Sequence, residues 1–138
     1  MPIYYTIDHE RRLVVAAADG VVSDEDVFGH QREVWSRTEL AWYDEIIDMT
    51  HATEIAVPHG GRVRDLAKLS ASMDVSGPKS RFAIVAPGDL AFGLGRMFQA
   101  FREIEPESRK QVGVFRTLEE AMQFLGLKKP PVFPRRTP

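Results

Sequence analysis

The chain of 138 residues contains no cysteine, and this absence excludes several kinds of chemistry. Disulfide bonds, cysteine-ligated zinc, iron–sulfur clusters and thiol nucleophiles all need this residue. Long apolar runs are missing as well, since none approaches the roughly 20 residues that a membrane helix requires. The first residues, MPIYYTIDHERR, lack the basic segment followed by an apolar segment that marks a secretory signal peptide. We therefore expect a cytoplasmic protein without a membrane span.

Excess positive charge is confined to the C-terminal end. The formal net charge is −2, yet residues 128–138 hold two lysines, two arginines and no acidic residue, which leaves about −6 for residues 1–127. Nucleic-acid binding needs clustered Lys and Arg, so this balance argues against a nucleic-acid partner. The length predicts a single domain, placed over residues 1–127. The tail, KKPPVFPRRTP, is expected to be disordered, or else to act as a weak docking peptide.

The stretch from Arg81 to Phe101 organises the predicted fold. Residues 82–86 are apolar without alternation, which is typical of a strand buried on both faces. Pro87-Gly88 predicts a turn, Asp89 a helix N-cap, and the apolar spacing that follows an amphipathic helix. The apolar side chains expected to face the core are Leu90, Leu94, Met97, Phe98 and Phe101. A buried strand that leads into a helix is the unit of an α/β sheet.

The rest of the chain predicts four more strands and three more helices. Strands are expected at residues 3–8, 13–18, 45–49 and 112–115, with residues 53–57 as a linking segment. Helices are expected to start near Ser23, Pro58 and Thr117. The first two strands should pair as an antiparallel hairpin, whereas each later strand is followed by a helix and needs a parallel neighbour. The order ββαβαβαβα therefore predicts one mixed, mostly parallel sheet with helices packed on it.

A ligand site is expected at the carboxyl ends of the parallel strands, where open α/β sheets bind their ligands. Helix amino ends at this edge offer free N–H groups, and the two glycines after His59 let the backbone approach a small anion. The candidate ligand-binding residues are Asp48, Thr50, His59, Gly60, Gly61, Arg62, Asp89 and Arg116. The alternatives are a glycine-softened helix start with a solvated Arg62, and an Asp48 carboxylate that caps the N–H groups of the next loop.

Catalytic and metal signatures are weaker. Asp48, His51 and His59 are ligand types that suit a transition metal, but their spacing matches no known pattern, and exposed histidines are the alternative. No serine lies in a G-x-S-x-G elbow, and Gly93-Leu94-Gly95 lacks the context of a dinucleotide site. His30 is expected to be an exposed or edge residue. We expect no metal, no cofactor and no catalytic residues.

Phe92 does not fit the core stripe of its predicted helix, because it lies about 200° from Leu90 around the axis. It would then lie on an outer face, where an exposed aromatic residue beside small residues and an arginine is typical of a protein interface. The candidate interface residues are Phe92, Gly95, Arg96 and Gln99. The alternative is that Phe92 packs locally under a loop.

Several stretches resemble the STAS-like, or SpoIIAA-like, domain superfamily, and in particular its bacterial branch without assigned activity. The likeness covers residues 3–126, and its main features are Asp8 with Arg12-Leu13-Val14-Val15, Ser23-Asp24-Glu25-Asp26, Asp48-Met49-Thr50, Arg81 through Met97, and Val114-Phe115-Arg116 with Glu120-Ala121. The resemblance implies a cytoplasmic, non-enzymatic domain that binds a protein or a small ligand. Members that bind lipids do so in an apolar cleft.

The sequence departs from this superfamily where its sporulation regulators are phosphorylated. Those proteins have a serine at the start of the second helix, whereas this chain reads Val57-Pro58-His59-Gly60-Gly61 and offers no hydroxyl group there. The phosphorylation switch is therefore not expected. Our leading hypothesis is a regulatory module that acts through protein contacts, as a homodimer or with another protein, with a small anion bound at the helix amino ends. The alternatives are a carrier of a lipid or other hydrophobic ligand, and a small enzyme that uses Asp48, His51 or His59.

Overall fold

The computed structural model describes residues 2–57, 59–75 and 79–134. They form five strands, β1 to β5, joined by four α-helices and a short 3-10 helix, η1. The strands are Ile3–Asp8, Leu13–Ser23, Asp44–Ala56, Arg81–Val85 and Gln111–Phe115. The helices α1 to α4 are Asp24–Trp35, Gly60–Ser72, Asp89–Ile104 and Leu118–Leu125, and η1 is Thr38–Leu40. The predicted order of elements is confirmed.

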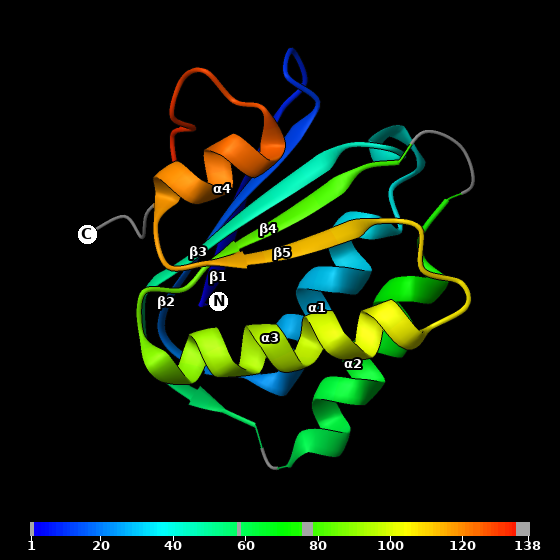
Figure 1. The fold of residues 1–138 in the computed structure, drawn as a ribbon, viewed down its shortest axis with the longest axis vertical. Helices are drawn as coiled ribbons and strands as arrows, with labels where there is room; N and C mark the ends of the chain where they lie inside the picture. Colours follow the sequence, from blue (N-terminus) through cyan, green and yellow to red (C-terminus); the bar gives the residue numbers. More distant parts are fainter. Residues whose placement is uncertain (1, 58, 76–78, 135–138) are drawn as a thin grey trace.

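The strands lie in one sheet in the order β1-β2-β3-β4-β5. β1 and β2 pair antiparallel, and the other neighbours pair parallel, with Ile46 opposite Ala83 and Ala83 opposite Gly113. The predicted mixed, mostly parallel sheet is therefore correct. Helices α1, α2 and α3 cover one face of the sheet, and α4 covers the other (Figure 1).

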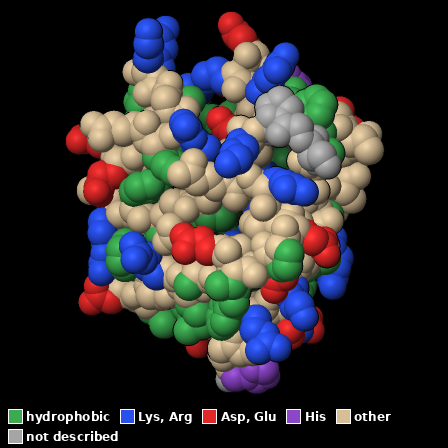
Figure 2. Space-filling model, turned by 45° about the vertical axis from the view of Figure 1, so that its right-hand side comes forward, with side chains coloured by type: hydrophobic (Ala, Val, Ile, Leu, Met, Phe, Trp, Pro, Cys, Tyr) green, Lys and Arg blue, Asp and Glu red, His purple; other side chains and the backbone are tan. Residues whose placement is uncertain are grey.

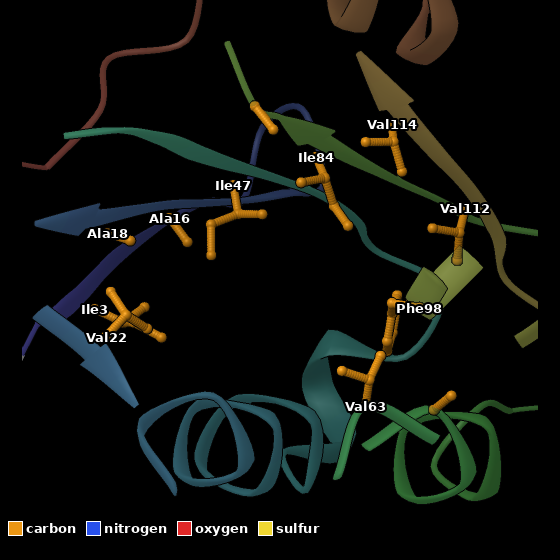
Figure 3. Packing of buried hydrophobic residues seen from close by; sticks show 12 residues of the cluster. Ile3, Ala16, Ala18, Val22, Ile47, Val63, Ile84, Phe98, Val112 and Val114 are labelled. Atoms are coloured by element: carbon orange, nitrogen blue, oxygen red, sulfur yellow. The ribbon is translucent and has the colours of Figure 1, made fainter. Parts of the chain in front are cut away.

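The largest hydrophobic cluster lies between the sheet and helices α1 to α3. Ile47 and Ile84 point from the strands toward Val63 of α2 and Phe98 of α3 (Figure 3). A second cluster lies under α4, where Ala121 and Leu125 pack against Ile46, Ala83 and Val85. Alternate residues of the central strands thus bury both faces, as the unbroken apolar runs require.

Strands β2 and β3 are much longer than predicted. Beyond the last paired residues of β1 and β4, Asp19–Ser23 and His51–Ala56 continue as a two-stranded ribbon, here called the β2–β3 extension. The register shifts between Ala17 and Asp19 and again between Gly20 and Val21. Such irregularities bend and twist a strand pair. The linking segment 53–57 is extended, and all of it except Val57 belongs to β3.

Helix starts follow their capping residues, with one correction. Ser23 accepts a hydrogen bond from the Asp26 N–H, and Asp26 returns one to the Ser23 N–H, so α1 begins with the expected cap. Thr117 caps α4 in the same way through the Glu120 N–H. The N-cap of α3 is Gly88 rather than the predicted Asp89, which occupies the first helical turn. The expected start of α2 at Pro58 lies outside the described residues.

The C-terminal segment contacts the folded body. Pro131 is buried, Phe133 packs against the cluster under α4, and Arg11 Nη1 donates a 2.8 Å hydrogen bond to the Lys129 carbonyl. Residues 128–134 thus contact the body at these positions, and residues 135–138 lie outside the described part. In that part, no helix has the length and apolar character that crossing a membrane demands.

Candidate functional site

An apolar cavity of about 130 Å³ lies between the sheet and helices α1 to α3. The strand side is formed by Ile47 and Ile84, which line the cavity from the middle of β3 and β4. The helix side includes Val27 of α1, Val63 and Leu66 of α2, and Ala91, Leu94, Gly95 and Phe98 of α3. Met49, Ile55 and Val57 add apolar side chains from β3 and the residue after it. We call this space the apolar cavity.

The cavity follows from the small residues that α3 turns toward the sheet. Gly95 packs so closely on the sheet that an added Cβ atom would lie 3.0 Å from Val114 Cγ1. Ala91, one turn earlier, has too little side chain to fill the space beneath it. Phe98, one turn later, packs edge-on against Phe82 with ring centres 6.1 Å apart. A helix held close to the sheet at Gly95 and Phe98, with a short side chain one turn before them, leaves a gap in the core.

Three polar side chains meet where His30 and Glu45 line the apolar cavity, and the third, Trp35, lies behind this wall. Glu45 is 3% exposed, and its two carboxylate oxygens accept hydrogen bonds from His30 Nε2 at 2.8 Å and from Trp35 Nε1 at 2.9 Å. Burial by itself raises the pKa of Glu45. The His30 hydrogen bond and the charges of His30 and Lys110, with the Trp35 hydrogen bond, outweigh burial and hold the pKa below its usual range. Glu45 is therefore an ionised, fully paired group.

A second cavity of about 210 Å³ lies on the other side of Glu45 and is here called the Lys110 cavity. Both cavities touch Gln31, Glu45 and Phe82, so these residues form the wall between them. Lys110 lies directly before β5 with its ammonium 3.2 Å from the centre of the Trp35 ring. Burial has the largest effect on the pKa of Lys110 and lowers it, whereas the charge of Glu45 raises it. The resulting pKa is about 8.

A buried ion pair lies next to the Lys110 cavity, which its Asp74 side chain helps to line. Arg102 of α3 is 1% exposed and donates to Asp74 Oδ2 at 2.6 Å and to the Ser70 hydroxyl. The same Asp74 oxygen accepts the backbone N–H groups of Arg109 at 2.7 Å and Lys110 at 2.8 Å. Asp74 thus fixes the backbone from which Lys110 projects.

The arginine of the predicted anion site pairs with a carboxylate of another helix. Arg62 Nε donates to Asp24 Oδ2 at 2.6 Å, and its guanidinium lies 4.3 Å from the Phe28 ring centre. This Asp24 contact lowers the pKa of Asp24, chiefly through the hydrogen bond, so the pair is ionic. His59, Gly60 and Gly61 are exposed at the start of α2, where His59 is the N-cap. The arginine of this turn is therefore already paired with a carboxylate.

The other rim residues are also paired with each other. Asp48 Oδ1 accepts hydrogen bonds from the Thr50 N–H at 3.0 Å and the Thr50 hydroxyl at 2.5 Å, which is the capping role considered for it. Arg116 Nη1 contacts Asp89 Oδ1 at 2.7 Å and the Pro87 carbonyl at 3.0 Å. His51 is exposed in the β2–β3 extension. Among the described residues, no group of three or more His, Asp and Glu side chains could hold a metal ion.

Helix α3 faces the sheet only partly as predicted. Gly95 is buried against Val114 and Ile84, and Gln99 donates to the Val112 carbonyl at 2.9 Å, so both face the sheet. Phe92 is partly buried and stacks on the Arg116 guanidinium at 4.0 Å, whereas Arg96 is exposed. Leu90 and Met97, expected in the core, are 59% and 38% exposed. Leu94, Phe98 and Phe101 pack on the core as predicted, so the predicted core stripe is wrong only at Leu90 and Met97.

The polar groups between the two cavities were not predicted from the sequence. His30 was expected at the surface but is 8% exposed. A signal existed, because His30 lies three residues after Val27 and four before Val34, on the apolar stripe of α1. Glu45 stands directly before the buried Ile46-Ile47 pair, where a charge needs a partner. Lys110 gave no signal, since its surroundings come from three distant segments.

The fold is known from a solved structure. An uncharacterised protein of the DUF3478 family from Shewanella loihica PV-4, described as having a SpoIIAA-like fold, matches with a TM-score of 0.55. The match is 17% identical in sequence and covers 89% of this chain and 93% of that one. No protein-family model and no curated protein matches the chain. This chain therefore has a SpoIIAA-like fold, as the sequence resemblance predicted.

Proposed function

We propose that this protein is a binding module that takes a small apolar ligand into the cavity between its sheet and helices α1 to α3. The observation behind the proposal is the apolar cavity itself, lined almost wholly by aliphatic and aromatic side chains. Close-packed interiors contain few voids larger than a water molecule. A cavity of about 150 Å³ with an apolar lining stays dry and accepts benzene or xenon, and the 130 Å³ observed here is of similar size.

The wall around Glu45 limits which ligands fit. His30 and Trp35 already donate to both carboxylate oxygens, so the wall presents a satisfied polar group rather than a free base. A ligand with a charged group facing this wall would lose hydration without gaining a free partner. The ligand class that fits best is a small hydrocarbon or an aromatic ring with at most one neutral polar substituent.

Binding rather than catalysis is supported by the polar groups at the carboxyl ends of the strands, which are paired with each other and do not line the apolar cavity. Asp48 bonds to Thr50, Arg62 to Asp24 and Arg116 to Asp89. A small enzyme needs a titratable group free to move a proton at a bound substrate. The three candidate acid–base residues considered from the sequence, Asp48, His51 and His59, do not line the apolar cavity.

Benzene binding tests the proposal. The change is Ala91→Leu, which adds a side chain inside the cavity, and the matched control is Ala100→Leu on the exposed side of the same helix. A ligand that binds only the folded state raises the unfolding temperature, by mass action. We expect saturating benzene to raise the unfolding temperature of the unmodified protein and of A100L but not of A91L.

The proposal is contradicted if benzene leaves the unfolding temperature of the unmodified protein unchanged. An equal shift in A91L would also contradict it, because the ligand would then lie elsewhere. Circular dichroism of A91L and A100L confirms that both variants are folded before the comparison is made.

Self-association through α3 is a second candidate. Leu90 and Met97 lie seven residues apart, hence on one side of the helix, and both are exposed. Figure 2 shows hydrophobic side chains gathered in the lower part of one face of the molecule. A second copy of this chain would cover such a surface by the two-fold pairing common in homodimers. In sedimentation equilibrium we expect a dimer that L90Q/M97Q weakens, and a monomer at all concentrations would exclude it.

A further inference from the structure

The Lys110 cavity lies apart from the proposed ligand site, at the opposite edge of the sheet from the carboxyl ends of the strands. Its volume of about 210 Å³ exceeds that of the apolar cavity. Lys110 immediately precedes β5, and Ser80, which immediately precedes β4, also lines the space. The cavity is thus formed where β4 and β5 begin, and Trp35 at the end of α1 forms another wall.

The ammonium group of Lys110 lacks an acceptor in this cavity. It lies 3.2 Å from the centre of the Trp35 ring, and no hydrogen bond from Nζ to another described residue is present. An ammonium group has three N–H donors, and a ring face satisfies at most one of them. The other N–H groups of Lys110 therefore need an oxygen acceptor from solvent or from a ligand.

The carboxylates nearest to Lys110 are occupied by other donors. Glu45 accepts from His30 and Trp35, and Asp74 accepts from Arg102 and from two backbone N–H groups. The third carboxylate, Asp44, accepts the Arg81 N–H at 2.8 Å. These carboxylates attract the ammonium through space, and Arg102 repels it. Their hydrogen bonds, however, are made to other donors and not to Lys110.

The walls favour an acid with a flat apolar body. Trp35, Trp42 and Phe82 contribute aromatic surface, and Arg37, Arg109 and Lys110 outnumber the two acidic residues that line the space. A cavity of about 150 Å³ holds benzene, so the 210 Å³ here leaves room for a ring with a carboxylate. We propose that the Lys110 cavity is a second binding site, for the carboxylate of a small aromatic acid.

Tryptophan fluorescence tests the proposal directly, because the only two tryptophans of the chain, Trp35 and Trp42, both line this cavity. The probe is sodium benzoate, and its uncharged counterpart is benzamide. At pH 6.5, where Lys110 is protonated, we expect a saturable change in emission with benzoate. Benzamide should bind about tenfold more weakly or not at all, because a carboxylate forms the stronger, charge-assisted hydrogen bond.

The pH dependence and two variants locate the site. Raising the pH to 9.5, above the pKa of about 8, removes most of the Lys110 charge and should weaken benzoate about tenfold or more. Lys110→Met should abolish the benzoate response, and Lys68→Met, on the exposed side of α2, should keep it. If K110M does not fold, the comparison of benzoate with benzamide and the pH dependence still test the proposal, because both use the unmodified protein. Equal binding of benzamide and benzoate, no saturable response at pH 6.5, or benzoate binding by folded K110M would overturn the proposal.

Discussion

Glu45 is a negatively charged residue that is only 3% exposed to solvent. It lies between the two cavities of the molecule. Its two oxygens are satisfied by His30 and Trp35, both from α1, so the charge ties this helix to β3. Removing one partner of such a buried pair is costly, because the other partner then stays buried and unpaired. The carboxylate also shapes both cavities, since it lines each of them.

Replacement of Glu45 should reveal its charge through pH. Glu45→Ala should lower the free energy of unfolding by about 3–5 kcal/mol at pH 7, and Glu45→Gln by less. Because the folded pKa lies below the ordinary value of 4.5, the ionised carboxylate stabilises the fold above pH 4.5. This contribution is lost as the pH falls through the folded pKa.

Urea unfolding of E45Q and the unmodified protein, at pH 7 and at pH 3.5, measures the effect. The difference between the two proteins should shrink at the lower pH, and Glu119→Gln, an exposed residue of α4, should show no difference at either pH. A difference for E45Q that stays constant or grows toward pH 3.5 would mean that Glu45 is not ionised in the folded state.

The roles of some single residues could be predicted from the sequence, and those of others could not. Ser23 and Thr117 were predicted as helix caps, because capping depends on neighbours three residues away. Arg62 and Arg116 were expected to bind an anion, but each meets a carboxylate from another element, Asp24 and Asp89. The local pattern gave no information on these distant partners. The burial of Lys110 likewise depends on distant residues, from Gln31 to Phe82, 79 to 28 positions before it.

Helix α3 lies close to the sheet because of one glycine. Gly95 sits between Val114 and Ile84, whereas an added Cβ atom at Gly93 would meet no atom within 4 Å. The two glycines share one helix and lie two residues apart, on different sides. Gly93 therefore shows only the low helix propensity of glycine, whereas Gly95 also allows the close packing of α3 on the sheet.

The two glycines should respond oppositely to alanine. Gly93→Ala should raise the free energy of unfolding by about 0.5–1 kcal/mol, because glycine is a poor helix former. Gly95→Ala gains the same propensity but forces Val114 to move, and overpacking of this kind costs about 1–3 kcal/mol. Thermal or urea unfolding of both variants measures this, and an equal gain in stability for both would show that α3 does not pack closely on β5.

The positions of the elements were predictable, but the full core-facing side of α3 and the length of β3 were not. The predicted stripe of α3 was right at Leu94, Phe98 and Phe101, but it included the exposed Leu90 and Met97 and left out the buried Gly95. A buried glycine has no side chain to signal its burial. In β3, residues 51–56 lack an alternating pattern, because they pair only with β2 and pass through register shifts.

In the whole molecule, three helices pack on one face of the sheet and one helix packs on the other (Figure 1). The order of strands followed from the regular alternation of strands and helices, which leaves few allowed topologies. The two cavities did not follow, since each is lined by residues from several elements whose side-chain volumes must be summed in space. The fold was therefore predictable from the sequence, and the candidate sites needed the structure.

The most direct test of the apolar cavity is nuclear Overhauser contact between benzene and the methyl groups of the protein. Ile47, Val63 and Ile84 line the cavity and are nearly closed to solvent, whereas Leu90 lies outside on α3. A ligand inside the core must lie within a few ångströms of the first three methyl-bearing residues. We predict contacts from benzene to Ile47, Val63 and Ile84 and none to Leu90. Contacts to Leu90 alone, or to no methyl group, would contradict the proposal that this protein binds an apolar ligand between its sheet and helices.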